Sequence, residues 1–352
     1  MRFKLGSKTI SLKKQPYFIA EIGVNFENDL KRAKKIIKLA KEGGADAVKF
    51  QSYKAEKIAC KKSPYYWDLK EVPIKSQYEL FKKFDKFGYK EFKLLKNYCD
   101  KLKIDFLSTP FDLDAVDYLD ELVPFFKIAS ADLNNVPLIE KIIKKKKPIV
   151  LSTGACKISE IEKTVNFIKS KNKNILLIIL HCVLSYPTKN SDAHLELIKV
   201  LRRKFSKNII GYSDHTMPDQ NMMILTSAYL NGAMVIEKHF SDTKGVKGND
   251  HFHSLNKNDL INFRSNIDIY NSINKNLKKR EVLNCEKISR KNARRSIVTA
   301  RRIKKGEILT KESLIMKRPG TGISPTQIDK IIGKIAKKNL QDDYAIKFSD
   351  LK

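Results

Sequence analysis

The 352-residue chain carries 70 Lys and Arg against 39 Asp and Glu, a formal net charge of +31, and 42% of its residues are hydrophobic. This length and apolar content suffice for a large core, which excludes a disordered chain. No apolar run approaches the roughly 20 residues of a membrane span and no signal-peptide core is present, so we expect a cytoplasmic protein with no membrane partner.

The lysine excess is spread along the chain, in runs such as Lys141–Lys147 and Lys169–Lys173. No pattern of stacking aromatic residues accompanies these runs, so we expect no nucleic-acid partner, although a positive field helps to capture anionic small molecules. The five cysteines are scattered and form no CxxC pair, which indicates reduced thiols rather than a disulfide or zinc framework.

The chain begins with a predicted hairpin over residues 3–12, and short apolar runs then alternate with amphipathic helical stretches. The predicted strands are Tyr17–Ile22, Ala47–Phe50, Asp105–Ser108, Phe125–Ala129, Pro148–Leu151, Ile175–Leu180, Ile209–Gly211 and Met234–Glu237. The predicted helices are Leu30–Glu42, Phe92–Lys103, Val136–Lys145, Ser159–Lys169, Leu195–Phe205, Gln220–Leu230 and Asp259–Lys278. Eight strand–helix units favour a (β/α)₈ barrel over a doubly wound open sheet, which more often has fewer strands.

Two segments depart from this alternation. The long connection from Ser52 to Lys90, which contains Trp67, predicts a functional flap over one end of the barrel. Beyond residue 279 the alternation stops. We therefore expect a catalytic domain over residues 1–279, a linker over 280–292, and a small second domain over 293–352 with strands at 294–300 and 303–309.

Chemistry in a (β/α)₈ barrel lies at the carboxyl ends of the strands. Polar residues stand there after every predicted strand, among them Glu21, Lys49, Gln51, Thr109, Lys127, Ser130, Asp132, Ser152, Tyr186, Ser213, His215, Glu237 and His239. Lys49 and Lys127 each belong to an apolar run, where a lysine is costly unless an anion neutralises it. They could bind a phosphate and a carboxylate, or form structural ion pairs with Glu21, Asp132 or Glu237.

Four of the six histidines fall between Gly211 and Leu255. His215 and His239 could form a two-imidazole metal site completed by water, substrate or a carboxylate, or could be hydrogen-bonded histidines of a polar barrel mouth. His251 and His253 follow the last strand and have no assigned role. At the end of the first strand, Glu21 could orient a hydroxyl or a water molecule.

Several sequence blocks resemble the sialic acid synthase family, in matching order and spacing: Glu21–Asn25, Gly44–Gln51, Phe126–Ser130, Leu151–Gly154, Gly211–Thr216, Glu237–Phe240 and Arg318–Ile323. The resemblance implies an α/β fold, a (β/α)₈ TIM barrel with a C-terminal antifreeze-like (SAF, β-clip) domain. It also implies a homodimer that swaps this domain over the partner's active site.

The reaction implied by this resemblance condenses phosphoenolpyruvate with an N-acylated amino sugar, giving a nine-carbon 2-keto-3-deoxy acid and releasing phosphate by C–O cleavage. N-acetylmannosamine is the first choice of acceptor, which would make the protein an N-acetylneuraminate synthase. The alternative is a legionaminate-type synthase that uses a 2,4-diacetamido-trideoxyhexose. A non-catalytic carbohydrate- or nucleic-acid-binding protein is the remote alternative.

The same resemblance implies a role for each site residue. His215 and His239 would bind a divalent metal, with Mn²⁺ expected and Mg²⁺ or Co²⁺ as alternatives. The catalytic residues would be Glu21, Lys49, Lys127 and Asp250. The substrate-binding residues would be Gln51, Thr109, Ser130, Asp132, Ser152, Tyr186, Ser213 and Arg318. The partner subunit would supply Arg318.

The sequence departs from the family pattern at five positions: Phe26, Asn28, where a glycine is expected, Asp132, Leu184 and Asn249. Leu184 cannot donate a hydrogen bond to phosphate, so a contact at that position is lost or moved elsewhere. Asp132 stands where many members carry glutamate in a sugar-recognition region, which leaves the acceptor open.

Overall fold

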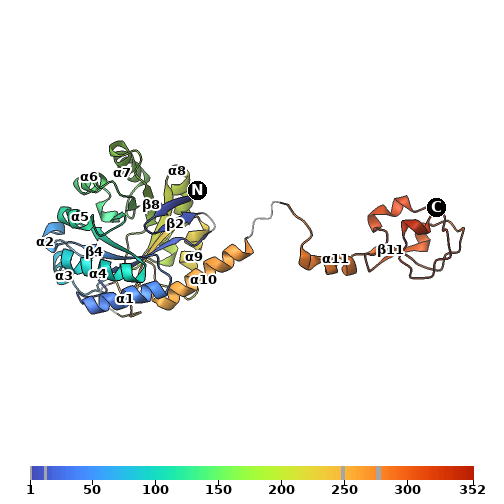
Figure 1. The fold of residues 1–352 in the computed structure, drawn as a ribbon, viewed down its shortest axis with the longest axis horizontal. Helices are drawn as coiled ribbons and strands as arrows, with labels where there is room; N and C mark the ends of the chain where they lie inside the picture. The colour runs from blue at the N-terminus through green and yellow to red at the C-terminus, as the bar shows by residue number, and fades with distance from the viewer. Residues whose placement is uncertain (1, 12–13, 247–249, 275–278) are drawn as a thin grey trace. The chain divides into compact units, whose positions relative to one another are not determined.

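The structure, a computed structural model, describes residues 2–11, 14–246, 250–274 and 279–352. The chain divides into two compact units, residues 1–275 and 276–352 (Figure 1), and each is described by itself. Asn249 and the end of the helix predicted over residues 259–278 lie outside the described residues.

The first unit is built on eight parallel strands. They are β3 (Tyr17–Gly23), β4 (Ala47–Ser52), β5 (Asp105–Pro110), β6 (Phe126–Ile128), β7 (Ile149–Ser152), β8 (Leu177–Cys182), β9 (Ile209–Asp214) and β10 (Val235–His239). Because β10 pairs with β3 as well as with β9, the sheet curls into a nearly closed barrel that starts at β5 and ends at β6. The predicted (β/α)₈ fold is confirmed, and each predicted strand overlaps an observed one.

Helices surround the strands (Figure 1). They are α1 (Leu30–Glu42), α4 (Tyr89–Leu102), α5 (Leu113–Leu119), α6 (Val136–Lys144), α7 (Ile158–Lys171), α8 (Glu196–Lys204), α9 (Met223–Leu230) and α10 (Lys257–Ile273). The short α5 was not predicted, and neither were α2 (Ala55–Ile58) and α3 (Gln77–Phe84) within the long connection.

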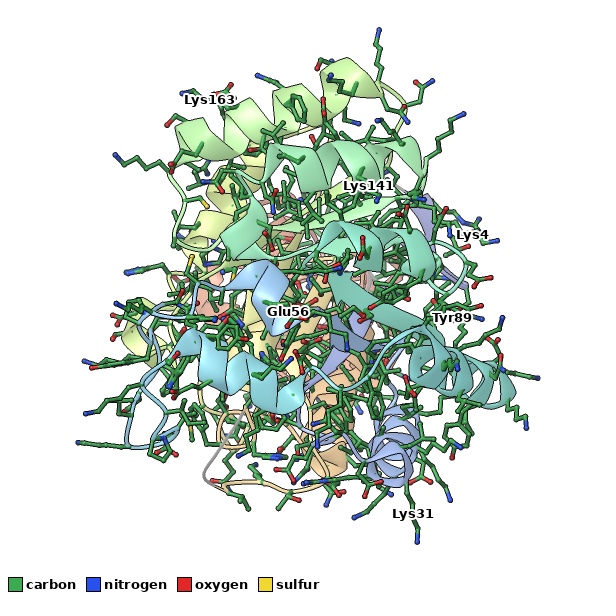
Figure 2. The ribbon with its side chains drawn as sticks, turned by 90° about the vertical axis from the view of Figure 1, so that its left-hand side faces the viewer. Lys4, Lys31, Glu56, Tyr89, Lys141 and Lys163 are labelled. Atoms are coloured by element: carbon green, nitrogen blue, oxygen red, sulfur yellow. The ribbon has the colours of Figure 1, made fainter. Side chains whose placement is uncertain are left out.

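Helix α1 illustrates why these segments form helices that pack on the barrel. Asp29 caps its first turn by accepting hydrogen bonds from the backbone N–H groups of Lys31 and Arg32. Its buried residues recur at helical spacing: Ala33, Ile36, Ile37 and Ala40. The opposite faces of the barrel helices are rich in lysine, and Lys4, Lys31 and Lys163 lie exposed at the edge of the unit (Figure 2).

The predicted hairpin is present as β1 (Arg2–Leu5) and β2 (Lys8–Ser11). It is tied to the amino end of the barrel, since the backbone N–H of Ser7 donates to Asp105 at the start of β5. The hairpin therefore covers the end opposite to the carboxyl ends of the strands. Within the described residues, no helix is long and apolar enough to cross a membrane.

The second unit has its own core, which includes Ile297, Ile303 and Ile346. Its elements are η3 (Asn284–Glu286), α11 (Lys287–Ala293), β11 (Ser296–Thr299), η4 (Lys311–Ser313), β12 (Leu314–Lys317), η5 (Pro325–Lys330) and η6 (Phe348–Asp350). The prediction of a strand over residues 303–309 is wrong. Ile303 and Ile308 form isolated bridges to Leu340 and Ile335, and the segment makes no continuous ladder with one partner.

Candidate active site

The carboxyl ends of the barrel strands border a cavity of about 500 Å³. Apart from Asp250 and Arg318, all the predicted site residues line it: Glu21, Lys49, Gln51, Thr109, Lys127, Ser130, Asp132, Ser152, Tyr186, Ser213, His215 and His239. The barrel thus brings together side chains that are spread through the sequence of the first unit, from Glu21 on its first barrel strand to His239 on its last.

Two lysines and two glutamates form a buried cluster in this cavity. Lys49 Nζ lies 2.5 Å from a carboxylate oxygen of Glu21 and 3.8 Å from one of Glu237. Lys127 Nζ lies 3.4 Å from the other oxygen of Glu237. With two charges of each sign the cluster is neutral, which allows four ionised groups to remain buried. The ion pairs expected as one role of these lysines are present with both glutamates.

The members of this cluster shift one another's pKa values. Burial alone would lower the pKa of Lys49, but Glu21 and Glu237 outweigh it and raise that pKa, whereas burial lowers the pKa of Lys127. Burial and the charge of Glu237 raise the pKa of Glu21. Burial would raise the pKa of Glu237, but the positive charges of Lys127 and Lys49 outweigh this effect, so the pKa is lowered. Glu21 is therefore the more easily protonated carboxylate, as suits a group that exchanges protons.

Four hydroxyl-bearing side chains line the cavity with the lysines: Thr109, Ser130, Ser152 and Ser213. Lys49 Nζ donates to Thr109 Oγ1 at 3.0 Å, and Ser213 Oγ donates to Glu237 at 3.0 Å. The buried Ser152 Oγ has no hydrogen-bond partner within the described part of the chain. Lysines and free hydroxyls are the groups that bind phosphate and carboxylate oxygens.

Three buried histidines converge beside this charged cluster. The ring centroid of His239, the last residue of β10, lies 5.5 Å from that of His215 and 4.6 Å from that of His253. Burial lowers the pKa of His215 to about 4 and that of the other two well below the usual value. All three imidazoles are therefore neutral near pH 7, the form that binds metals.

The donor atoms at this end of the cavity fit a divalent metal. His215 Nδ1 donates to the carbonyl oxygen of Val183 at 2.9 Å, which leaves Nε2 as a ligand. Asp250 Oδ2 lies 3.3 Å from His239 Nδ1. Donor atoms of His239, Asp250 and His253 all lie within 4.8 Å of one another. Imidazole and carboxylate donors suit first-row divalent ions.

Gly23 gives Glu21, Gln51 and Asp250 room to approach one another. A register shift interrupts the β3–β4 pairing between Glu21 and Gly23, and Gly23 has a φ of +56°. A Cβ there would lie 3.2 to 3.4 Å from side-chain atoms of all three neighbours. Gln51 Nε2 donates to Glu21 Oε1 at 3.1 Å. Burial, with Glu21 adding to it, raises the pKa of Asp250 to about 7.

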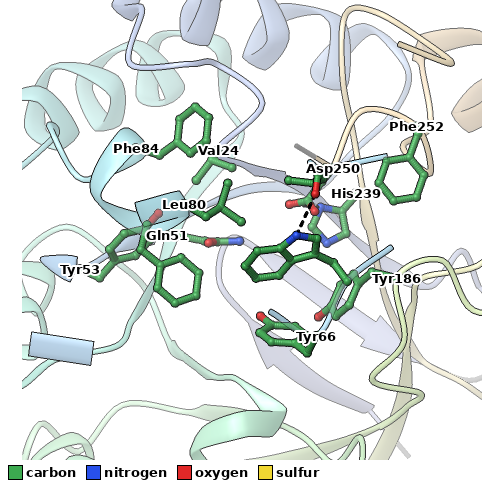
Figure 3. A pocket seen from close by; sticks show the side chains of 13 residues that line it. Val24, Gln51, Tyr53, Tyr66, Leu80, Phe84, Tyr186, His239, Asp250 and Phe252 are labelled. Atoms are coloured by element: carbon green, nitrogen blue, oxygen red, sulfur yellow. Dashed lines mark hydrogen bonds and ion pairs between the residues drawn. The ribbon is translucent and has the colours of Figure 1, made fainter. Parts of the chain in front are cut away.

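Part of the long connection between β4 and α4 forms the wall of a smaller cavity of about 110 Å³ (Figure 3). Tyr66 and Trp67 of this connection line it together with Tyr186, His239 and Asp250. The rings of Tyr66 and Tyr186 lie 6.0 Å apart. Because Tyr66, Tyr186 and His239 also line the larger cavity, the two cavities adjoin.

A buried ion pair between Lys238 and Asp214 holds the start of the loop after β9 in place. Lys238 Nζ lies 2.6 Å from Asp214 Oδ2 and donates to the carbonyl oxygen of Thr216 at 2.7 Å. Asp214 also accepts hydrogen bonds from the Tyr212 hydroxyl and from the backbone N–H of Thr216. These contacts hold the backbone on both sides of His215.

The departures from the family pattern have structural consequences. Phe26 is buried, with its ring centroid 5.4 Å from that of Phe50 and 4.7 Å from that of Phe87, so an apolar contact occupies its position. Leu184 and Asp132 both line the larger cavity. Burial raises the pKa of Asp132, whose Oδ1 accepts a hydrogen bond from the Asn135 side chain at 3.0 Å.

The structure adds two residues to the predicted site. Glu237 lies within ion-pair distance of both lysines, and His253 is the third histidine of the group. Glu237 was expected only as one possible ion-pair partner of these lysines, although charge balance favoured it, because two buried lysines require two nearby carboxylates. Arg318 lies exposed in the second unit, so its expected contact with a partner subunit's site stays a prediction.

Comparisons with known proteins identify the family of the chain. Residues 36–279 match the profile of the NeuB family, and residues 294–352 match that of the SAF domain. An N,N'-diacetyllegionaminic acid synthase from Campylobacter jejuni is 39% identical over 95% of this chain and 99% of its own. The human N-acetylneuraminate-9-phosphate synthase is 31% identical over 94% of this chain and 91% of its own.

Similar solved structures include an N-acetylneuraminic acid synthetase from Leptospira borgpetersenii, solved in complex with citrate. It superposes with a TM-score of 0.70 at 33% sequence identity and covers 82% of this chain and 95% of that chain.

Proposed function

Because the chain belongs to the NeuB family and carries a SAF domain, we propose that it is a nonulosonate synthase. It condenses phosphoenolpyruvate with an N-acylated amino sugar, forms a nine-carbon 2-keto-3-deoxy acid and releases inorganic phosphate. The observation that carries this proposal is the buried Lys49–Glu21–Glu237–Lys127 cluster beside three neutral histidines. One half of the site suits an anion and the other a metal.

Phosphoenolpyruvate binds at the lysine half of the cavity. Lys49 and Lys127 bind its phosphate and carboxylate oxygens, and Thr109, Ser130, Ser152 and Ser213 donate hydrogen bonds to the same oxygens. Both lysines are already paired with carboxylates, so the incoming anion competes with Glu237 for their charge.

Carbon–carbon bond formation joins C3 of phosphoenolpyruvate to the aldehyde carbon of the sugar, and water then adds to C2. Glu21 orients this water and takes its first proton, which passes on to the alkoxide that the aldehyde oxygen has become. The C–O bond to phosphate then breaks in the tetrahedral species as the C2 hydroxyl gives up its proton to the departing phosphate and becomes the ketone. Lys49 and Lys127 stabilise the departing phosphate electrostatically. Gln51, Asp132, Tyr186 and Asp250 position the sugar and the reacting centre.

His215 and His239 hold a divalent metal, with Mn²⁺ as the first choice and Mg²⁺ or Co²⁺ as alternatives. When bound, this ion supplies Lewis-acid polarisation of the sugar's aldehyde oxygen. The contact of His215 Nδ1 with the Val183 carbonyl keeps its ring oriented for that role.

N-acetylmannosamine is our first choice of acceptor, with an N-acetylneuraminate product. A second candidate is a 2,4-diacetamido-trideoxyhexose, which gives a legionaminate-type product. The identities of relatives favour it: N,N'-diacetyllegionaminic acid synthases from Campylobacter jejuni and Legionella pneumophila are 39% and 36% identical, against 31% for the human N-acetylneuraminate-9-phosphate synthase.

We also place the protein in the cytoplasm as a homodimer. In that dimer, the SAF domain of one subunit brings Arg318 to the sugar bound in the barrel of its partner. Arg318 is exposed and therefore accessible for such a contact. An arginine there binds the acyl group of the amino sugar through its guanidinium donors.

The proposed function is tested by phosphate release from phosphoenolpyruvate with each acceptor sugar in the presence of Mn²⁺. We expect release that depends on the acceptor, and a product mass equal to acceptor plus pyruvate. The acceptor with the higher kcat/KM identifies the branch. No release with any amino sugar, from folded and metal-loaded protein, would refute the synthase proposal.

A further inference from the structure

His253 belongs to the loop after β10, and its imidazole ring is buried beside those of His215 and His239. It is 0% exposed, and neither ring nitrogen has a hydrogen-bond partner among the residues that the structure describes. The other buried histidines outside the predicted metal pair are satisfied. His251 Nδ1 lies 2.7 Å from Ser241 Oγ, and His181 Nε2 donates to the Ala193 carbonyl at 2.8 Å. A polar ring buried without partners requires an explanation.

The position of His253 explains why its buried ring has no hydrogen-bond partner: it lies where a metal ion could bind. Its ring centroid lies 4.6 Å from that of His239 and 6.2 Å from that of His215. An imidazole nitrogen about 2.1 Å from a metal places its ring centroid roughly 3.2 Å from that metal, so two rings on one ion lie roughly 4.5 to 6.4 Å apart. The three centroid distances, including 5.5 Å between His215 and His239, all fall within this interval.

A carboxylate completes the group. One donor atom each from His239, Asp250 and His253 forms a set whose members lie within 4.8 Å of one another. Asp250 Oδ2 contacts His239 at 3.3 Å. An anionic oxygen next to neutral imidazoles is a donor set suited to a divalent ion, and the ion would satisfy one of the two ring nitrogens of His253 that the protein leaves unpaired.

We propose that His253 is a further ligand of the divalent metal, bound to the same ion as His239 with Asp250 as the carboxylate donor. This inference rests on the proposed function, because the ion is the divalent metal that the proposed function assigns to His215 and His239. The loop after β10 would then take part in metal binding through His253 and Asp250.

Metal titration of chelator-treated, full-length protein tests this proposal. Calorimetry with Mn²⁺ and with Co²⁺ should give one ion per chain, with binding at least about tenfold weaker in His253→Phe, which keeps a ring but has no nitrogen. The matched control is His251→Asn in the same loop, which keeps a nitrogen near Ser241 and should bind as the wild type does. Equal affinity for His253→Phe and wild type, or no ion bound by the wild type, would overturn the proposal.

A second variant keeps the test decisive if His253→Phe does not fold. In His253→Cys loaded with Co²⁺, direct ligation should produce a new thiolate-to-cobalt band in the near-ultraviolet difference spectrum against wild type. His251→Cys should show none. A His253→Cys spectrum identical to the wild type would place residue 253 outside the coordination sphere.

These measurements need neither phosphoenolpyruvate nor a sugar, so they separate the two proposals. If metal binding depends on His253 and no condensation product forms, the synthase proposal fails and the ligand assignment stands. If product forms and the His253 variants bind metal as the wild type does, the ligand assignment fails alone.

Discussion

The ammonium group of Lys49 pairs with two buried carboxylates, those of Glu21 and Glu237. Replacing Lys49 alone should therefore lower the free energy of unfolding, and also removing the charge of Glu21 should restore much of it. Lys49→Met leaves Glu21 without its 2.5 Å partner, and removal of one member of a buried pair costs about 3–5 kcal/mol. The double variant Lys49→Met/Glu21→Gln removes both charges, so we expect it to regain most of that stability. Urea unfolding monitored by circular dichroism measures both.

Stability and activity should separate in these variants. The double variant should stay inactive, because it lacks the phosphate-binding cation and the carboxylate assigned to the water. Lys41→Met, at a half-buried lysine outside the site whose Nζ donates to the Lys103 carbonyl oxygen, is the control and should change neither property by much. A double variant as unstable as Lys49→Met would show that Glu21 and Lys49 do not compensate each other.

His181 predicts a pH dependence of stability. Its burial lowers the pKa of the folded state below the usual value of about 6.5. Below pH 6.5 the unfolded chain therefore binds a proton that the folded chain refuses, so this residue makes stability fall as pH falls, by up to about 1.4 kcal/mol per pH unit. The loss ends once the pH is below the folded pKa.

The variant His181→Gln retains a donor for the Ala193 carbonyl and does not titrate. Unfolding free energies of wild type and variant, measured with a chelator between pH 7.5 and 5, should converge as the pH falls. The difference between the two proteins isolates His181 from the other buried histidines. A constant difference over that interval would contradict the lowered pKa.

At the scale of elements, the β4–α4 connection contributes the aromatic wall of the smaller cavity. Trp67 is the chain's only tryptophan, and its Nε1 donates to the carbonyl oxygens of Val72 and Ile74 at 3.1 Å each. Tyr66 lies between Trp67 and Tyr186, with ring centroids 5.2 and 6.0 Å away. A sugar entering beside Tyr186 would therefore alter the surroundings of Trp67.

We expect tryptophan fluorescence to change on addition of the acceptor sugar to metal-loaded protein. Tyr66→Ala should raise the KM of the acceptor about fivefold, since one aromatic contact contributes roughly 1 kcal/mol, and should leave the KM of phosphoenolpyruvate nearly unchanged. Tyr66→Phe is the control and should bind normally. An equal rise in both KM values would indicate that the connection supports the whole site and does not select the sugar.

The elements that the sequence predicted are those with strong local patterns. Eight apolar runs flanked by amphipathic helices specify the barrel, and α1 coincides with its prediction because Asp29 and the buried alanines and isoleucines mark it. Helix α3 lies within the connection that was expected to form a flap, and α5 has only 7 residues, which is too few to show a clear helical period. The segment 303–309 is apolar like a strand, but its partners at 335 and 340 are set by tertiary contacts.

The site was predictable to a similar degree. Strand ends identify Glu21, Lys49, Lys127, His215 and His239 because parallel strands gather their carboxyl ends at one face. Sequence could not show that His253, distant from a strand end, turns back to within 4.6 Å of His239. Nor could it show which lysine pairs with which glutamate, since this depends on barrel closure between β10 and β3.

At the scale of the whole molecule, net charge and site charge have separate roles. The chain carries a formal +31, while the buried lysine–glutamate cluster is neutral. Attraction of an anionic substrate over distance therefore comes from surface lysines, and salt screens such interactions over about 8–10 Å. Raising the ionic strength with KCl should lower kcat/KM for phosphoenolpyruvate several-fold and leave kcat nearly constant. A parallel fall of kcat would instead indicate a salt effect on the chemical step.

The last prediction concerns assembly. If Arg318 of one subunit completes the barrel site of its partner, Glu21→Gln and Arg318→Ala proteins, each inactive alone, should complement when mixed under conditions of subunit exchange. Half of the dimers are then mixed, and each has one intact site, so about a quarter of wild-type activity should return.

Glu21→Gln mixed with Lys49→Met is the control, because both substitutions lie in the barrel and no pairing of subunits restores a site. Native mass spectrometry verifies that mixed dimers form in both experiments. Mixed dimers without recovered activity in the Glu21→Gln and Arg318→Ala mixture would mean that Arg318 acts within its own chain. A wholly monomeric protein that remains active would exclude the swapped dimer, because every site must then draw its arginine from the subunit that carries it.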